Sequence, residues 1–299
     1  MEEHLSRKAY LLAILAVIFW STSPTAFKLG LRFQESYQLL TGASLTSAAI
    51  LGIIVIASPR RRIFTDIGWK DIGFSAIMGL MNPVAYYLIL FKAYTILPAQ
   101  VAQPLNMIWP IVLVLISIPM LRQRIGWKSL AAMLLSFAGV VVVSLQGGTV
   151  GKDPQNRLGI FLALSTSVIW ALYFLYNARD NKDPVIRLFL NFLFASIYLL
   201  LGGMLRNAAF PGSIEGWATA IYVGIFEMGV TFVLWLMAIQ AAPATDRISN
   251  LVYLAPFLNL VIVRMVLKEE IFGSTVIGII LLVAGILMQN LIGRSESSR

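Results

Sequence analysis

The chain has 299 residues, of which 59% are hydrophobic and 12% are charged. Charged residues make up about 25% of ordinary soluble domains, so this composition excludes a soluble fold that could bury its apolar surface. The chain has no cysteine, which excludes disulfides and thiolate chemistry, and its single histidine is His4, so we expect no metal site.

The formal net charge of +9 does not indicate a nucleic-acid-binding protein. The basic residues separate apolar stretches and form no patch beside an RNA- or DNA-binding motif. Such a distribution is typical of the loops of a membrane protein. We therefore expect this chain to lie in a lipid bilayer and to bind no nucleic acid.

Ten apolar stretches are each long enough to cross a bilayer core, which takes about 20 helical residues. The segments between them are too short for a soluble domain, so the sequence predicts an all-α integral membrane protein. The first stretch lacks an A-x-A-like cleavage site and is expected to remain as an anchor. The predicted spans are Ala9–Phe27, Ser36–Ala57, Ile72–Phe91, Pro98–Met120, Trp127–Gln146, Leu158–Ala178, Val185–Leu205, Gly216–Met237, Ala244–Leu267 and Phe272–Gly293.

The positions of Lys and Arg predict the orientation. If the amino terminus is inside, the cytoplasmic segments contain 15 of the 23 Lys and Arg residues. The run Arg60–Arg62 is the strongest single contribution to this bias. Positive charge is retained on the cytoplasmic side, so both termini are expected in the cytoplasm.

The chain repeats itself after its midpoint. Gly79 and Gly224 are 145 positions apart, and several other short motifs recur at nearly the same offset. The halves, residues 1–148 and 149–299, meet near a glycine-rich turn and contain five predicted spans each. An odd number of spans inverts the second half relative to the first. The pattern therefore predicts ten transmembrane helices in two inverted five-helix repeats around a central cavity, an architecture typical of transporters.

Glu227 marks the centre of that cavity. It is the only carboxylate between Gly216 and Thr245, and a charge at mid-bilayer costs several kcal/mol, roughly 3 on insertion scales. The repeat pairs it with Asn82, which also lies midway along a span. Both could face one shared site; alternatively, Asn82 could form a helix–helix hydrogen bond and Glu227 a buried structural pair.

Aromatic and small polar side chains recur at helical spacing along the spans that carry these two residues and along four others. They could line a substrate site, although single aromatic residues also serve packing and interfacial belts. The residues that we predict to bind substrate are Trp20, Asn82, Tyr86, Gln103, Asn106, Trp109, Trp170, Tyr173, Glu227 and Tyr253.

Several motifs are missing from the sequence. No G-x-x-x-x-G-K-[ST] is present, so ATP is not expected to drive this protein directly. No H-E-x-x-H and no paired catalytic aspartates indicate an intramembrane protease. We therefore expect a protein that is not an enzyme and needs no cofactor.

Both halves contain short motifs that are typical of one family of membrane proteins: Ile18–Thr22, Ala93–Tyr94, Pro98–Ala99, Pro110, Ala238, Pro243–Ala244, Tyr253–Pro256 and Glu269–Glu270. With these motifs the chain resembles, over nearly its whole length, the EamA-type branch of the drug/metabolite transporter superfamily. Within that branch it is most similar to bacterial aromatic amino acid exporters of the YddG type. The first-half counterpart of Glu269–Glu270 is Gln123–Arg124, which departs from strict symmetry.

The resemblance implies a secondary transporter of the bacterial inner membrane that exports aromatic or other hydrophobic amino acids and related small metabolites. The residues are compatible with such substrates, because Trp and Tyr faces stack on rings and Glu227 or the amides could bind the zwitterion. A multidrug exporter of lipophilic cations, with Glu227 as counter-ion, is an alternative. A non-transporting membrane scaffold is another.

Coupling and assembly stay open at this point. The Glu227 carboxyl group could serve a proton cycle or bind only substrate. Gly278 and Gly285 could pack against a second subunit or against the fifth span, so the chain could be a monomer or a weak homodimer.

Overall fold

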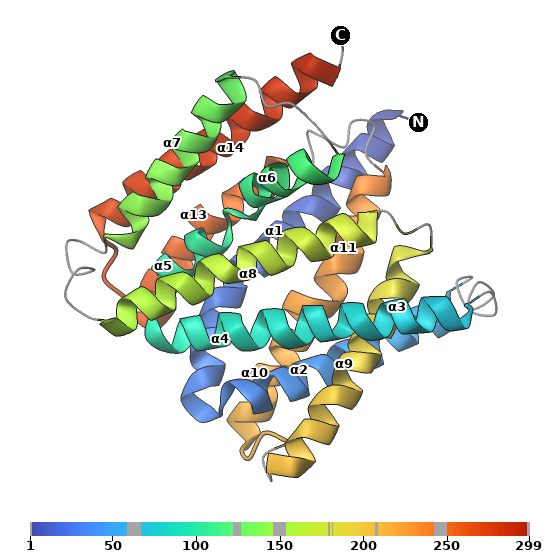
Figure 1. The fold of residues 1–299 in the computed structure, drawn as a ribbon. Coiled ribbons are helices and arrows are strands. Elements are labelled where there is room, and N and C mark those ends of the chain that lie inside the picture. The colour runs from blue at the N-terminus through green and yellow to red at the C-terminus, as the bar shows by residue number, and fades with distance from the viewer. Residues whose placement is uncertain are drawn as a thin grey trace. The chain divides into compact units, whose positions relative to one another are not determined.

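The computed structural model describes residues 2–58, 67–121, 127–145, 154–178, 180, 182–206, 209–241 and 250–297. Every regular element in these ranges is helical (Figure 1). Within them, six helices are long and apolar enough to cross a membrane: Arg7–Phe33, Ser36–Ala57, Trp69–Ile96, Pro154–Asn177, Pro184–Leu205 and Ile214–Ala238. Shorter apolar helices cover Leu130–Val143, Ala255–Leu267 and Gly273–Met288. The expectation of an all-helical membrane protein is confirmed.

The chain forms two compact units, and each draws on both halves of the sequence. Unit 1 comprises Met1–Phe91 and Arg179–Leu258, and unit 2 comprises Lys92–Ala178 and Asn259–Arg299. The basic run Arg60–Arg62, the glycine-rich connection and the motif Pro243–Ala244 lie outside the described residues.

Among the described residues, unit 1 contains eight complete helical elements from the first and second halves, followed by a short 3₁₀ helix. Two further helices, α4 (Tyr86–Ile96) and α13 (Ala255–Ile262), begin in unit 1 and continue into unit 2. The complete elements are α1 (Glu2–Phe33), α2 (Ser36–Ala57), α3 (Trp69–Gly79), η2 (Leu80–Ala85), α9 (Pro184–Arg206), α10 (Ile214–Val223) and η4 (Gly224–Gly229), with α11 (Val230–Ala241) and the 3₁₀ helix η5 (Asn250–Leu254) after them.

An antiparallel pair of helices, α2 and α9, forms the centre of unit 1. The Tyr37 hydroxyl at the start of α2 donates to Leu199 O near the end of α9, at 2.7 Å. Farther along α2, Gly52 packs against the ring of Phe189, near the start of α9. Helices α3 and η2 pack on α9, α10 and η4 pack on α2, and α1 packs along α10 and α11.

Unit 2 is built on the pair α7 (Trp127–Ser144) and α14 (Gly273–Ser297), which run side by side (Figure 1). A Cβ at Gly139 would lie 2.5 Å from Leu282 N, and a Cβ at Gly285 would lie 2.6 Å from Ala132 O. Gly278 meets α7 in the same way, 2.7 Å from Gly139 O. Gly278 and Gly285 of the last span therefore pack against the fifth span within the chain.

The predicted fourth span is broken into two helices, α5 (Ala99–Asn106) and α6 (Trp109–Leu121). Pro110 has no N–H to continue the helix, and a proline restricts the residue before it, so a new helix begins at Trp109. Helix α8 (Pro154–Ala178) packs on both pieces. The segment Val263–Leu267 forms the π-helical element η6, which ends at Lys268 in a left-handed conformation.

Large apolar side chains are exposed on helices of both units. Leu11 and Ile53 in unit 1 and Leu134 and Ile280 in unit 2 are among them. Exposed apolar surface on this scale marks contact with another apolar phase, here the lipid of the bilayer. Lipid-facing surface of this kind is what the composition predicted.

Candidate functional site

Glu227 lies within unit 1 in the π-helical element η4, midway along the candidate span Ile214–Ala238. The Tyr87 hydroxyl donates to Glu227 Oε1 at 2.9 Å. The Trp20 Nε1–H donates to the backbone oxygen of Glu227 at 3.4 Å. Three helices, α1, α4 and η4, thus supply the groups around this carboxyl group.

Near Glu227 a glycine lets the backbone pack closely on α2, and side-chain hydroxyl groups donate hydrogen bonds to backbone carbonyl groups. A Cβ at Gly224 would lie 2.6 Å from Ala43 O, so only glycine allows η4 to approach α2 this closely. The Ser47 hydroxyl donates to Gly224 O at 2.7 Å, and the Thr231 hydroxyl donates to Phe226 O. These bonds satisfy carbonyl groups that the wider π turn leaves without regular α-helical partners.

Asn82 occupies the corresponding π-helical element of the first half, η2. Its backbone angles, φ −144° and ψ 119°, are not helical, because Pro83 disfavours the helical conformation of the residue before it. The side chain is 3% exposed, and Oδ1 has no hydrogen-bond partner in the described part of the chain. A buried polar atom without a partner is costly. Within the described part of unit 1, Asn82 Oδ1 is such an atom, and it can still accept a hydrogen bond.

The two π-helical elements have matching packing partners. Gly79 precedes η2, and a Cβ there would lie 2.4 Å from Asn191 O on α9. Gly224 begins η4, where the nearest atoms belong to Ala43 and Thr46 on α2. Thr46 and Asn191 are 145 positions apart, the same offset that relates Gly79 to Gly224. The two broken helices therefore use equivalent contacts on α2 and α9.

Aromatic side chains surround Glu227 on the side of α1 and α11. Phe19 packs on Phe226 with ring centroids 4.8 Å apart. Trp20 packs on Phe232 at 5.4 Å and on Trp235 at 5.3 Å. The Trp20 ring is therefore engaged by two rings of its own chain and joins α1 to α11.

Tyr87, and not the predicted Tyr86, reaches the Glu227 carboxyl group. The prediction placed Gly79, Asn82 and Tyr86 on one face by regular α-helical spacing. The π-helical turn and the non-helical angles of Asn82 shift that register by about one residue. Tyr86 is also buried, and its ring lies edge-on to Tyr87 with centroids 4.7 Å apart. A proline after the polar residue was the sequence signal for this shift.

Five predicted residues belong to unit 2. The Tyr94 hydroxyl donates to Gln103 Oε1 at 2.9 Å, within the segment from α4 to α5. Asn106 Nδ2 donates to Thr166 Oγ1 at 2.8 Å and joins α5 to α8. The other three predicted residues make aromatic contacts: Trp109 packs on Phe174 with centroids 5.6 Å apart, and Trp170 packs on Tyr173 at 5.8 Å.

The predicted set is thus divided between the units. Trp20, Asn82, Tyr86 and Glu227 belong to unit 1, where Trp20 and Glu227 are in direct contact. Tyr253 lies in η5, and its side chain is outside the described part of the structure. The predicted substrate-binding set did not include Tyr87, which contacts Glu227, or Trp235, which contacts Trp20.

Comparison with protein families gives two matches along the chain. The model of the EamA-like transporter family matches residues 7–145 and again residues 157–291. A solved crystal structure of 21% sequence identity superposes with a TM-score of 0.67 and covers 97% of this chain and 99% of its own. At this identity the structural similarity concerns the fold.

Curated relatives are similar over almost their full length. The "Aromatic amino acid exporter YddG" of Ancylobacter novellus is 23% identical, with 96% of this chain and 98% of the relative covered. The "Probable amino-acid metabolite efflux pump" of Escherichia coli is 23% identical, with 94% of each chain covered. An "Uncharacterized transporter" of Archaeoglobus fulgidus is 24% identical over 93% of this chain and 97% of its own. The chain belongs to the EamA-like transporter family and is a membrane transporter.

Proposed function

We propose that this protein is a secondary transporter that exports aromatic or other hydrophobic amino acids and related small metabolites by alternating access. The observation that carries the proposal is the Glu227 carboxyl group in the middle of a candidate span, hydrogen-bonded by Tyr87. Ionisable groups at this depth are expensive and mark substrate or ion pathways. The names of two relatives, an aromatic amino acid exporter and an amino-acid metabolite efflux pump, support this substrate class.

The proposed architecture is ten transmembrane helices in two inverted repeats, residues 1–148 and 149–299, around a central cavity. The two family matches support it, one in each half. So does the packing of α7 on α14, where Gly139 meets Leu282 and Gly285 meets Ser136. Ser136 and Leu282 are 146 positions apart, as are Gly139 and Gly285, so the two halves make reciprocal contacts. Inverted repeats of this kind bind substrate near the bilayer midplane.

Each unit, taken by itself, carries groups that suit part of a zwitterion with a ring. In unit 1 the Glu227 carboxylate and the unpartnered Asn82 Oδ1 are acceptors for a substrate ammonium group, and Tyr253 belongs to the same proposed set. In unit 2 the amides of Gln103 and Asn106 are donors for a carboxylate. The rings of Trp109, Trp170 and Tyr173, also in unit 2, offer faces for stacking, which adds about 0.5–1.5 kcal/mol per aromatic pair.

Alternating access needs an energy source other than direct ATP use. Glu227 is the only carboxylate between Gly216 and Thr245, so it is the group that could exchange a proton for substrate. In this scheme protonation and substrate ammonium compete for one carboxylate, which couples the two fluxes. The protein acts in the inner membrane with both termini cytoplasmic, as a monomer or a weak homodimer.

A second candidate function is the export of lipophilic cations, with Glu227 as counter-ion. The aromatic rings beside Glu227 favour a cationic substrate. The ring centroids of Phe19 and Phe226 are 4.8 Å apart, and those of Tyr222 and Phe226 are also 4.8 Å apart. Aromatic faces attract cations, by about 2 kcal/mol or more when both are desolvated.

Transport into liposomes separates these functions. Purified protein would be assayed with labelled phenylalanine, labelled alanine and labelled tetraphenylphosphonium, each with and without an imposed pH gradient. Amino acid export predicts saturable flux of phenylalanine above that of alanine. Flux of tetraphenylphosphonium alone would establish the second candidate, and no flux of any compound above protein-free liposomes would contradict both.

A further inference from the structure

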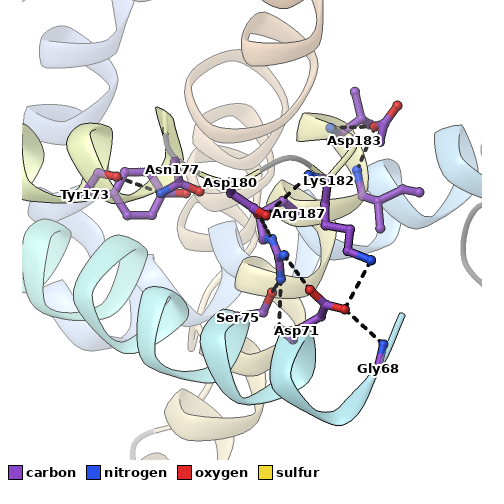
Figure 2. A network of polar contacts seen from close by, with 11 residues as sticks. Gly68, Asp71, Ser75, Tyr173, Asn177, Asp180, Lys182, Asp183 and Arg187 are labelled. Atoms are coloured by element: carbon purple, nitrogen blue, oxygen red, sulfur yellow. Dashed lines mark hydrogen bonds and ion pairs between the residues drawn. The ribbon is translucent and has the colours of Figure 1, made fainter. Parts of the chain in front are cut away.

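Outside the site around Glu227, a cluster of charged side chains lies in unit 1 (Figure 2). Arg187, near the start of α9, is only 4% exposed, and its Nη2 lies 3.1 Å from Asp71 Oδ1. Its Nη1 donates to Ser75 Oγ at 2.9 Å, and its Nε contacts Asp180 Oδ2. Every nitrogen of the guanidinium group has a partner, so this Arg187 cluster holds α3 against α9 and needs no ligand. Its members are Arg187, Asp71, Ser75 and Asp180.

Unit 2 contains a buried carboxylate oxygen in a different situation. Glu269 follows Lys268, whose left-handed conformation ends η6. Glu269 Oε1 accepts a hydrogen bond from the backbone N–H of Ala99 at 3.2 Å. Oε2 of the same carboxyl group is buried and has no hydrogen-bond partner in the described part of the chain. Ala99 is the first residue of α5 and lies 170 positions earlier in the sequence, so one oxygen of Glu269 bonds the beginning of a distant helix.

The beginning of α5 needs an acceptor from outside the helix. The N-cap residue is Pro98, which has no polar side chain and makes no side-chain cap. The N–H groups of Val101 and Ala102 bond to Pro98 O, but Ala99 has no acceptor within the helix, because helix starts leave their first donors unsatisfied. A Ser, Thr, Asp or Asn ordinarily accepts at this end. Glu269 supplies the acceptor instead, at the positive end of the helix dipole, where a carboxylate is favoured.

A second residue of α5 holds the same turn. Gln100 is 1% exposed, its Nε2 donates to Glu270 O, and its Oε1 accepts from the N–H of Phe272 at 3.1 Å. Phe272 directly precedes α14. Glu269 and Gln100 together join the start of α5 to the turn that leads into α14. We call these contacts, from Glu269 to Ala99 and from Gln100 to Glu270 and Phe272, the α5 clamp.

The two adjacent glutamates have different parts in the α5 clamp. Glu269 contributes its side chain, whereas Glu270 contributes its backbone oxygen and has an exposed side chain. The clamp therefore depends on the side chain at position 269 and on the backbone alone at position 270. A substitution that leaves the backbone in place should be tolerated at Glu270.

Helix α5 depends on contacts with other elements for its position. It has 8 residues, whereas isolated helices shorter than about 12–15 residues are marginal in water. Pro104 lies inside it and cannot donate to the oxygen of Gln100, which removes one of its internal hydrogen bonds. The helix ends before Met107, and α6 begins at Trp109. Neither end of α5 is thus continuous with a longer helix that could fix its orientation.

The contacts that hold α5 lie at its start, its middle and its end. The α5 clamp holds the start. The Tyr94 hydroxyl donates to Gln103 Oε1 at 2.9 Å, and Asn106 Nδ2 donates to Thr166 Oγ1 at 2.8 Å. Gln103 and Asn106 are the amides that we propose for a substrate carboxylate. Ala99, Gln103 and Asn106 are at i, i+4 and i+7, so they follow one side of the helix, and a shift at Ala99 moves both amides.

We propose that Glu269 is a positioning residue for substrate binding. It accepts the hydrogen bond of Ala99 and thereby fixes α5, so that the two amides of this helix can bind the carboxylate of an amino acid. The inference rests on the proposed export of amino acids. Glu269 itself touches no substrate in this scheme. Because only one of its oxygens is bonded, its role requires an acceptor of the right length, and a neutral amide can supply one.

The first test needs no substrate. Hydrogen–deuterium exchange in detergent, followed by mass spectrometry, compares the start of α5 with α7. Glu269→Leu removes the acceptor and should speed exchange at the start of α5 at least about threefold, as expected for loss of one hydrogen bond, without a change in α7. Glu269→Gln keeps an acceptor and Glu270→Gln keeps the backbone, so both should exchange like the wild type. Unchanged exchange in Glu269→Leu would overturn the proposal.

A second substitution covers the case in which Glu269→Leu does not fold. Glu269→Asp keeps the charge, but its side chain is one methylene shorter and should not reach Ala99. Its exchange at the start of α5 should therefore rise as in Glu269→Leu. Wild-type exchange in Glu269→Asp would show that the charge near the helix start is enough, which would contradict the requirement for the bond.

The second test measures phenylalanine transport in liposomes. Loss of a contact that contributes equally to binding and to the later steps raises KM and leaves the maximal rate unchanged. Glu269→Leu should raise the KM at least about tenfold, as for a lost hydrogen bond to a charged group, and Glu269→Gln should restore it. Glu270→Gln should transport like the wild type. A Glu269→Gln variant as defective as Glu269→Leu would show that the charge itself is required and would overturn the positioning role.

A compound without a carboxylate separates positioning from a general loss of structure. Phenethylamine has the ring and the ammonium group of phenylalanine, and α5 offers it no contact of the proposed kind. Its inhibition constant against labelled phenylalanine should stay the same in Glu269→Leu. Equal weakening of both compounds would assign Glu269 a structural role only and overturn the proposal. Failure of the wild type to transport any amino acid would contradict the proposed function, while the exchange rates would still decide whether Glu269 holds α5.

Discussion

The Tyr87 hydroxyl donates a 2.9 Å hydrogen bond to Glu227 Oε1, joining two broken helices that occupy corresponding places in the two sequence halves. Tyr87 comes immediately after η2, and Glu227 lies within η4. Both helices depart from α-helical geometry beside the polar residue that each brings to mid-span. The proposed function needs this carboxyl group to exchange with a ligand or a proton, and the first two predictions test that need.

Glu227→Gln should leave the protein folded and reduce transport by more than about tenfold, because a hydrogen bond to a charged group contributes about 1.5–3 kcal/mol. Glutamine keeps the shape of the side chain and removes its charge. Flux into liposomes, normalised to folded protein, measures the loss. Glu215→Gln, on an exposed residue at the start of the same span, is the matched control. Transport near the wild-type rate in Glu227→Gln would mean that the carboxyl group is structural.

Tyr87→Phe should reduce transport about three- to tenfold, since it removes one hydrogen bond worth about 0.5–1.5 kcal/mol. The ring remains and keeps its contacts with Phe27 and Phe91. Tyr198→Phe removes a hydroxyl that donates to a backbone oxygen, Ala76 O, and should not change flux. Equal effects of the two substitutions would contradict a role of Tyr87 at the carboxyl group.

The tryptophans should separate into two groups on replacement by alanine. Trp20→Ala should lower thermal stability and depress every flux, because the ring joins α1 to α11 through Phe232 and Trp235. Trp109→Ala and Trp170→Ala should weaken phenylalanine flux more than alanine flux, because stacking needs a ring on the substrate. Competition between the two amino acids measures the ratio. A ratio of phenylalanine to alanine flux that stays constant in all three variants would contradict stacking of the substrate on Trp109 and Trp170.

Gly139→Ala should destabilise the protein by about 1–3 kcal/mol, the usual cost of overpacking a tight contact. The added Cβ would lie 2.5 Å from the Leu282 backbone nitrogen, so α7 and α14 would have to separate. Gly273→Ala, where a Cβ meets nothing within 4 Å, is the control. Thermal unfolding in detergent, followed by circular dichroism, compares the two. A Tm for Gly139→Ala equal to that of the control would contradict this packing.

Single cysteines at Gly68 and Gly212 should show opposite labelling in intact cells. The excess of Lys and Arg predicts that Gly68 is cytoplasmic and Gly212 external. A membrane-impermeant maleimide should label Gly212→Cys at once, and Gly68→Cys only after the cells are permeabilised. The reverse pattern would invert the orientation, and with it the side on which the Arg187 cluster lies.

The sequence alone determined the class of this protein and the positions of its central polar residues. A helix must span about 30 Å of hydrocarbon, so length and hydropathy are sufficient to find membrane spans. A carboxylate in such a span is rare enough to be informative by itself, which is why Glu227 could be chosen before any contact was known. The repeat offset of 145 residues then led from Glu227 to Asn82. Small residues at a fixed offset, such as Gly79 and Gly224, were likewise visible as a pattern.

Only the tertiary structure decided which side chains meet. Regular spacing selected Tyr86, but Pro83 and the π turn brought Tyr87 to Glu227, because one extra residue in a turn changes the face that follows. The charge pattern of the sequence reveals no partner for Arg187, yet this residue is buried between Asp71 and Asp180, which are distant from each other in the sequence. Contacts of this kind depend on how separate helices pack, and hydropathy along one helix carries no information about its partner.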